Sequence, residues 1–262
     1  MTYTIITVNY NNKEGLEATI KSVLCQTCKD YEYIVVDGGS TDGSVDVIQK
    51  YASHLGYWIS EPDNGIYQAM NKGIVKAKGE YLNFMNSGDC YYDDQVLSTM
   101  SSQLRADIVE GNLYRQDTKS IALRPYKNPT LRNFVEGSLN HQACFIKRSL
   151  FNERLYDESL RICADWKFFL ERLIFDNCSY LQSETFIANY EGAGLSACSP
   201  QHAIERKKVL QSLLPQRILS DYERYMGIES PMIDLIPRFN KTYRLHLLIV
   251  AVVRLILTIF RK

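Results

Sequence analysis

The sequence has no excess of either charge. Its 30 Lys and Arg residues balance 30 Asp and Glu residues, which gives a formal net charge of +0. A nucleic-acid-binding protein or an enzyme acting on a polyanion usually carries a surplus of basic residues. We therefore expect no nucleic-acid partner, and any electrostatic preference must come from a local cluster of charges.

The sequence also lacks an N-terminal pattern of basic, apolar and small residues, which would mark a secretory signal. Its seven cysteines are an odd number, as expected for free thiols in a reducing cytoplasm. Cys25 and Cys28 form an isolated C-x-x-C on a predicted helix, and no second pair or nearby histidine pair completes a zinc site. We therefore interpret the cysteines as small buried or half-buried thiols.

Two nucleotide-binding patterns are missing. The P-loop motif G-x-x-x-x-G-K-[ST] does not occur, which argues against a P-loop enzyme. A nucleotidyltransferase would carry a glycine-rich basic loop near the amino end, but the segment TVNYNNKEG contains only Lys13 as a basic residue. Both classes are therefore disfavoured.

The first ninety residues alternate between short β-branched runs and helical patterns. This alternation predicts a mainly parallel sheet joined by crossover helices. The predicted strands are 4–8, 33–36, 57–59 and 81–85, and the predicted helices are 16–24, 45–51 and 66–77.

Polar residues follow each of these strands. In open α/β sheets the ligand lies beyond the carboxyl ends of the strands, so these positions are where chemistry is expected. The four groups are Asn9 with Tyr10, then 37–40, 61–64 and 86–89. We expect four carboxylates to meet at this edge.

The pattern loosens between residues 90 and 195, where a strong helix is predicted around Trp166 to Ile174. The predicted organisation is one α/β domain over residues 1–200 and a helical region over 201–262. Within that domain, residues 1–90 would bind the nucleotide and 91–200 would face the acceptor.

The last segment, Leu245 to Phe260, is rich in Leu, Ile and Val but contains Arg254. It is shorter than the roughly 20 apolar residues of a spanning helix, and basic residues flank it. This composition favours a helix lying on anionic lipid, with a buried or oligomer-forming helix as the alternative. The favoured location is the cytoplasm, peripheral to the inner face of the cell membrane.

Residues 3–198 resemble family 2 glycosyltransferases through six motifs in the expected order. These are TIITVNYNN, VVDGGSTDGS, EPDNGIYQAMNKGI, YLNFMNSGD, HQACFIKRSLF and ADWKFFLE. The resemblance implies a single GT-A domain with a mainly parallel mixed sheet between helices. It also implies inverting transfer of a sugar from a nucleoside diphosphate sugar, with a UDP-sugar as the expected donor, to a saccharide or lipid-linked acceptor in surface polysaccharide synthesis.

The resemblance also implies a set of donor-binding residues: Thr7, Asn9, Tyr10, Asp37, Gly38, Asp63, Asn86 and His141. The residue types leave structural alternatives open. Asp37 could satisfy only the amides of its own turn, and Asp63 or Asn64 could cap the following helix. His141 could be a structural histidine rather than a contact to the donor phosphate or sugar.

The segment Asn86-Ser87-Gly88-Asp89 occupies the place of the family's acidic metal motif. A divalent cation, Mn²⁺ or Mg²⁺, would offset the charge that gathers on the leaving diphosphate. The segment is less acidic than the family's D-x-D form, so Asp89 is the expected metal ligand, with Asp93 or Asp94 as weaker candidates. This depletion motivates a rival hypothesis, a catalytically weak sugar-nucleotide-binding subunit of a membrane assembly.

Asp165 is the candidate general base, because the family places its base at the aspartate of this motif, next to an aromatic residue that shapes the acceptor pocket. Here that aromatic residue is Trp166. Partial burial can raise the basicity of such a carboxylate. The structural alternative for Asp165 is a helix N-cap. A loop at 191–196 could close over the diphosphate.

Overall fold

The structure is a computed structural model that describes residues 1–115, 120–122, 127–190 and 200–233. Two units are defined, Met1–Arg206 and Lys207–Lys262. The predicted apolar segment 245–260 and the predicted closing loop 191–196 lie outside the described residues. In the part of the chain that is described, no helix is long and apolar enough to cross a membrane.

Within the described residues, nine strands form one mixed sheet in the order β3-β2-β1-β4-β8-β6-β9-β5, with β7 paired to β6. The first four strands in this order are parallel, whereas β8 runs antiparallel to both β4 and β6. The strands are β1 (Tyr3–Asn9), β2 (Tyr31–Asp37), β3 (Tyr57–Ser60), β4 (Tyr81–Phe84), β5 (Cys90–Tyr91), β6 (Ile108–Arg115), β7 (Ser120–Ala122), β8 (Cys144–Lys147) and β9 (Tyr180–Tyr190).

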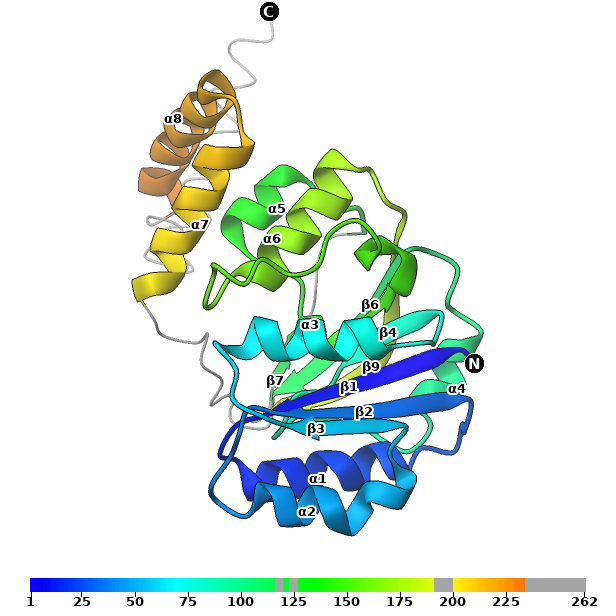
Figure 1. The fold of residues 1–262 in the computed structure, drawn as a ribbon. Helices are drawn as coiled ribbons and strands as arrows, with labels where there is room; N and C mark the ends of the chain where they lie inside the picture. The colour runs from blue at the N-terminus through cyan, green and yellow to red at the C-terminus, as the bar shows by residue number, and fades with distance from the viewer. Residues whose placement is uncertain (116–119, 123–126, 191–199, 234–262) are drawn as a thin grey trace, which may run out of the picture. The chain divides into compact units, whose positions relative to one another are not determined.

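Helices cover both faces of this sheet (Figure 1). Helices α1 and α2 lie together on one face, and α3 lies on the other, against β1 and β2. The helices of the first unit are α1 (Lys13–Leu24), α2 (Ser44–Tyr51), α3 (Ile66–Lys76), α4 (Val96–Ser101), α5 (Leu131–Glu136) and α6 (Ala164–Leu170), followed by the first part of α7 (Pro200–Leu213). The predicted α/β architecture is therefore confirmed.

The local reasons for these elements agree with the sequence. The apolar residues Leu16, Ile20 and Val23 are buried on one face of α1, and the Asn12 side chain accepts a hydrogen bond from the Gly15 N–H at its start. The helix ends at Leu24, so the prediction that Cys25 and Cys28 lie on it is wrong. Gln26 and Thr27 instead hold the following loop to residues 93–95.

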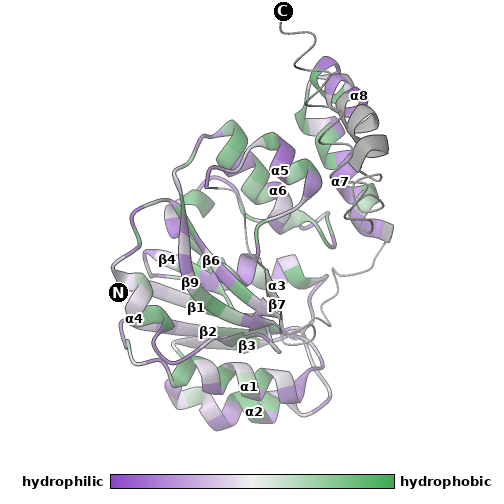
Figure 2. Ribbon diagram, turned by 180° about the vertical axis from the view of Figure 1, so that it is seen from behind, coloured by the Kyte–Doolittle hydropathy of each residue, from purple (hydrophilic) through white to green (hydrophobic). Residues whose placement is uncertain are grey.

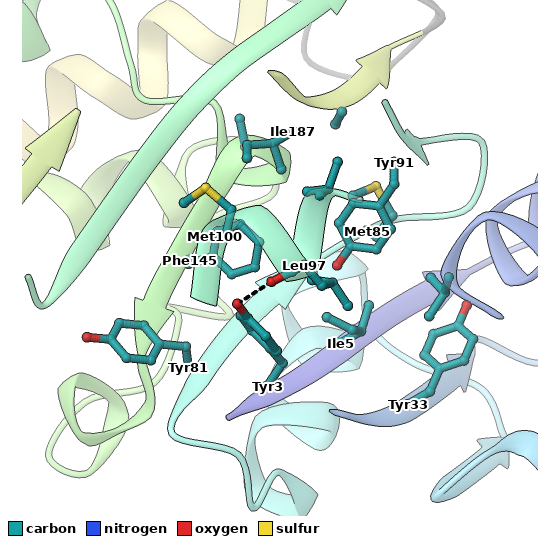
Figure 3. Packing of buried hydrophobic residues seen from close by; sticks show 14 of the residues in the cluster. Tyr3, Ile5, Tyr33, Tyr81, Met85, Tyr91, Leu97, Met100, Phe145 and Ile187 are labelled. Carbon is teal, nitrogen blue, oxygen red and sulfur yellow. Dashed lines mark hydrogen bonds between the residues drawn. The ribbon is translucent and has the colours of Figure 1, made fainter. Parts of the chain in front are cut away.

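The main core lies between the sheet and the helices α1, α2 and α4 (Figure 3). Tyr3 is fully buried in this core, and the Tyr3 hydroxyl donates to the Leu97 carbonyl at 2.8 Å. Burial raises the pKa of Tyr3 to about 12, so this phenol stays neutral. Hydrophobic residues run along the strands of the sheet (Figure 2), and this packed layer fixes the strand ends that carry the polar residues.

The second unit contains the end of α7 and helix α8 (Gln216–Ile233). Val209, Leu214 and Leu219 are its buried apolar residues among those whose side chains are described. Helix α8 and nearly all of α7 lie within the predicted helical region over 201–262, whose residues from 234 onward lie outside the described part of the chain.

Candidate active site

The order in which strands are added to the sheet reverses at β1. Strands β2 and β3 follow on one side of β1, and β4 lies on its other side. A crevice at such a switch point is where α/β proteins bind ligands. Asn9 and Asp37 are paired in register at the ends of β1 and β2. The Ser87 N–H, just after β4, donates to the Val8 carbonyl at 3.1 Å. The Glu61 N–H, just after β3, donates to the Asp37 carbonyl at 3.0 Å, so all four predicted polar groups meet at this edge.

Asp37 is fully buried and its carboxylate accepts five hydrogen bonds from the chain. The donors are the Asn9 side chain, the Gly39 and Ser40 N–H groups, and the Ser40 and Ser60 hydroxyls, at 2.6–3.2 Å. Burial alone would raise the pKa of Asp37, but these donors lower it below its usual value. The carboxylate organises its own loop, and a direct contact to a nucleotide stays a prediction.

Gly38 makes room for the carboxylate of Asp63. A Cβ added at Gly38 would lie 2.6 Å from Asp63 Oδ2 and 3.3 Å from the ring of Tyr10. The Tyr10 ring is exposed, at 67% of its full surface. An exposed aromatic ring, a bare backbone and a carboxylate thus lie side by side, an arrangement that suits a flat heterocycle with hydrogen-bond donors.

Thr7 does not lie at this edge. It is fully buried within β1, where its hydroxyl donates to the Met85 carbonyl at 2.7 Å and contacts the Tyr33 hydroxyl at 2.9 Å. Its predicted role in donor binding stays a prediction.

The predicted cap of α3 is wrong in detail. Its N-cap residue is Gly65, with φ of 132°, and no side chain caps it. Asp63 Oδ1 instead accepts from the Gly65 N–H at 2.9 Å and so closes the turn before the helix. Lys72 of α3 also holds this turn, because its ammonium lies 2.8 Å from Glu61 Oε1.

The turn after β4 presents Asn86 and Asp89. The Asp89 N–H donates to the Asn86 carbonyl at 2.9 Å, and Gly88 adopts a φ of 102°, which a glycine tolerates without strain. Thr19 in α1 holds this turn, because its hydroxyl lies 2.7 Å from the Asp89 carbonyl. Asp93 and Asp94 are exposed and hold the next turn through Gln95, so the structure does not bring them to the site.

Asp165 lies at the centre of a network of side chains. Its Oδ2 is 3.3 Å from His141 Nδ1, and its Oδ1 is 2.8 Å from the Tyr67 hydroxyl. On the other side of the ring, His141 Nε2 lies 3.1 Å from Asn86 Nδ2. The network therefore connects the candidate base to the turn after β4.

The charges in this network stabilise each other. Burial would lower the pKa of His141, but Asp165 and then Asp89 raise it above its usual value. Burial would raise the pKa of Asp165, but His141 and Tyr67 lower it. The expectation that burial raises the basicity of Asp165 is therefore wrong in sign, because its partners outweigh desolvation. The carboxylate is ionised at neutral pH, as a proton acceptor must be.

Asp165 is not the N-cap of α6. Helix α6 begins at Ala164 with Cys163 as its N-cap residue, so Asp165 lies inside the first turn. The neighbouring Trp166 is buried, with 1% of its surface exposed, and its indole N–H donates to the Phe134 carbonyl at 2.9 Å. Trp166 therefore supports the site from behind, rather than lining an acceptor pocket.

A divalent cation is compatible with the residues at this turn. Among the described residues, no group of three or more His, Cys, Asp or Glu side chains could hold a metal ion by itself. However, Asn86 Oδ1 is buried without a hydrogen-bond partner, and the negative charge of Asp89 helps to raise the pKa of His141. Mg²⁺ and Mn²⁺ prefer oxygen ligands, and such ions often bind one or two protein groups plus substrate phosphates.

Sequence reasoning missed Tyr67 and Ser60 as site residues, and it included Ser40 only as part of the polar group 37–40. Tyr67 lies within the EPDNGIYQAMNKGI motif, so the motif contained a signal for it. Ser40 follows β2 and Ser60 is the last residue of β3, and both could have been found by asking which donors saturate Asp37.

Comparison with known proteins agrees with this geometry. A family model described as glycosyl transferase family 2 matches residues 4–156. An uncharacterized glycosyltransferase of Mycobacterium tuberculosis is 35% identical over 178 residues, which cover 64% of this chain and 68% of the relative. A PGL/p-HBAD biosynthesis glycosyltransferase of Mycobacterium bovis is 31% identical over 174 residues, which cover 63% of this chain and 67% of that relative.

Solved structures share the fold. Residues 1–349 of S. aureus TarS in complex with UDP-GlcNAc match with a TM-score of 0.62 at 18% identity, over 75% of this chain and 60% of that one. The mannosyltransferase PcManGT from Pyrobaculum calidifontis, in complex with GDP-Man and Mn²⁺, matches with a TM-score of 0.59 at 15% identity, over 74% of this chain and 58% of that one. The chain thus spans about 60% of the TarS fragment. The fold is of the GT-A type, and the chain belongs to glycosyl transferase family 2 and is a transferase.

Proposed function

We propose that this protein transfers a sugar, with inversion, from a UDP-sugar to a hydroxyl of a saccharide or lipid-linked acceptor in the synthesis of a surface polysaccharide or glycolipid. Asp165 carries the proposal, because it is an ionised and largely buried carboxylate held by His141 and Tyr67 beside the turn after β4. A sugar nucleotide in the crevice would present its anomeric carbon near this turn.

Asp165 would accept the proton of the attacking hydroxyl as the new glycosidic bond forms. The Asp165 side chain is 16% exposed, so an acceptor hydroxyl could still reach the carboxylate while most of it is shielded from bulk water. The hydrogen of the Tyr67 hydroxyl is shared between Asp165 Oδ1 and the Ile162 carbonyl, which fixes the direction of the carboxylate. This orientation leaves the proton-accepting lone pairs in a defined place.

Asn86 Oδ1 and the carboxylate of Asp89 would hold a divalent cation together with the two phosphates of the donor. When bound, the cation supplies positive charge that stabilises the leaving nucleoside diphosphate. His141 Nε2 lies 3.1 Å from Asn86 Nδ2, so a ring that accepts from this amide would keep Asn86 Oδ1 turned toward the cation. The positive charge of the cation opposes the negative charge that develops on the diphosphate.

The base of the nucleotide would lie against Tyr10 and over Gly38, with its N–H donor directed to Asp63. Uracil has one such donor in its ring. The similar TarS structure was determined with UDP-GlcNAc, which supports a uridine-linked donor for this chain. The C-terminal segment 245–260 would place the enzyme on the cytoplasmic face of the membrane, near a lipid-linked acceptor.

The test is a transfer assay with a panel of UDP- and GDP-sugars, with Mn²⁺, Mg²⁺ or chelator, on the wild type and on Asp165→Asn. We expect donor-dependent turnover that needs the metal, and a loss of about 10² to 10⁴ in Asp165→Asn, the range for a general base. Asn keeps the size of the side chain, so thermal stabilisation by UDP should persist.

Two results would contradict the proposal. Turnover of Asp165→Asn within about tenfold of the wild type would remove Asp165 from the chemistry, because the predicted loss begins at about 10². Binding of a sugar nucleotide without transfer to any acceptor, in the wild type with metal, would favour the rival, a sugar-nucleotide-binding subunit. That rival is motivated by the single carboxylate of the segment from Asn86 to Asp89.

A further inference from the structure

The segment that leads into α6 is held from α7 by a buried carboxylate. Glu205 is 4% exposed and accepts hydrogen bonds from three consecutive backbone N–H groups. The Arg161 N–H reaches Glu205 Oε1 at 3.1 Å, and the N–H groups of Ile162 and Cys163 reach Oε2 at 3.0 and 3.2 Å. Cys163 is the N-cap residue of α6, so Glu205 binds the N–H of this N-cap residue and those of the two residues before it.

Two routes connect Glu205 to Asp165. The first is the backbone, because Cys163 is only two residues before Asp165. The second passes through Ile162, whose N–H donates to Glu205 and whose carbonyl oxygen lies 2.7 Å from the Tyr67 hydroxyl. Tyr67 in turn contacts Asp165 Oδ1. A displacement of this segment would therefore move both the base and the phenol that orients it.

Other contacts between the start of α7 and the α6 region point the same way. The guanidinium of Arg206 lies over the ring of Trp166, at 4.8 Å from its centroid. The Cys163 thiol lies 3.5 Å from the His202 carbonyl. Burial would raise the pKa of Glu205, but the three backbone N–H groups and Gln201 lower it, so the carboxylate is charged at neutral pH.

We propose that Glu205 is a positioning residue for Asp165, holding the start of α6 so that the carboxylate meets the acceptor hydroxyl in the reactive geometry. The inference rests on the proposed role of Asp165 as the base. Glu205 lies beyond residue 156, where the match to the family model ends. Misplacement of a reacting group by about 1 Å can cost about 10² in rate, which sets the scale of the effect.

The experiment measures kcat and the KM for the donor in Glu205→Gln, Glu205→Asp, Asp165→Asn and the double variant Asp165→Asn with Glu205→Gln. Glutamine keeps the shape but loses the charge and places an NH₂ group against backbone donors. We expect kcat to fall at least about tenfold, while the donor KM and thermal stabilisation by UDP stay within about twofold. Glu205→Asp keeps the charge and should restore part of kcat.

The control is Glu136→Gln, the same substitution at an exposed glutamate whose described ion pair is with Arg132 on its own helix. Its kcat should stay within twofold of the wild type. In the double variant, Glu205→Gln should cause no further loss beyond that of Asp165→Asn, because residues that act through one another are not additive.

Amide hydrogen exchange provides a readout that does not depend on activity. Exchange at residues 161–163 should become faster in Glu205→Gln, while exchange in β1 should not change. A kcat of folded Glu205→Gln within twofold of the wild type, with Asp165→Asn inactive, would overturn the positioning role and leave the base in place. Independent losses that multiply in the double variant would also overturn it. An active Asp165→Asn would instead remove the proposed base.

Discussion

The loop after β2 and the start of α6 each bury one aspartate, but the chain surrounds the two carboxylates differently. Asp37 accepts from amide and hydroxyl donors, none of which titrates near neutral pH. Asp165 is held by the Tyr67 phenol, whose pKa burial raises well above its usual value, and by the His141 imidazole, which can itself exchange a proton. A carboxylate saturated by neutral donors is a structural anchor, whereas one held by an imidazole can take part in proton transfer.

The largest expected effect that would test this contrast is on stability. Asp37→Ala should lower the free energy of unfolding by about 3 kcal/mol or more, because it leaves several buried donors without an acceptor. Asp165→Asn keeps an acceptor in place and should lower it by about 1 kcal/mol. Urea denaturation of both variants measures the difference. Equal losses in the two variants would remove the distinction between anchor and base.

The second prediction concerns the space at Gly38. In Gly38→Ala the new methyl group would lie against Asp63 Oδ2 and force this carboxylate away from Tyr10. We expect UDP to bind about tenfold more weakly, a loss of about 1.4 kcal/mol, with a smaller change in stability. Titration calorimetry with UDP measures this effect.

Gly56→Ala is the matched control, since the Cβ there would meet its nearest neighbour at 3.5 Å, an ordinary contact. It should bind UDP as the wild type does. Unchanged UDP affinity in Gly38→Ala would mean that the surface formed by Tyr10, Gly38 and Asp63 does not contact the nucleotide.

The smallest expected effect is the pH dependence of the Glu205 contact. The pKa of Glu205 is lowered from 4.5 on folding, so the charged form stabilises the native state above that value, and this contribution is lost as the pH falls through the folded pKa. The wild type should exceed Glu205→Gln by about 1 kcal/mol in unfolding free energy at pH 6. The excess should shrink below about pH 4.5, as measured by urea titration at several pH values. An excess that grows on acidification would contradict the assignment.

The sequence predicts the parallel half of the molecule well because each of its signals is local. The strands from β1 to β4 and the helices between them follow from apolar patterns and polar strand ends within the first 84 residues. Asn9 and Asp37 were predicted to meet because carboxyl ends of parallel strands share one edge.

The second half could not be predicted in the same detail. Tyr67 and Asp165 are 98 residues apart in the chain, and Glu205 is 42 residues beyond Cys163. No local pattern marks a glutamate in a polar helix as the partner of distant backbone N–H groups. The sequence likewise could not predict whether the pKa of Asp165 is raised or lowered, because the net shift depends on the position of His141.

The separation between these partners also has a consequence for synthesis at the ribosome. The strands β1 to β4 are complete once residue 84 has emerged, but the core that they share includes Val109, Phe145 and Ile187 from later strands, and domains generally fold as units. The crevice and the start of α6 are therefore fully supported only after β9 and Glu205 have left the exit tunnel. A nascent chain would acquire the crevice and the supported carboxylate together, late in its synthesis.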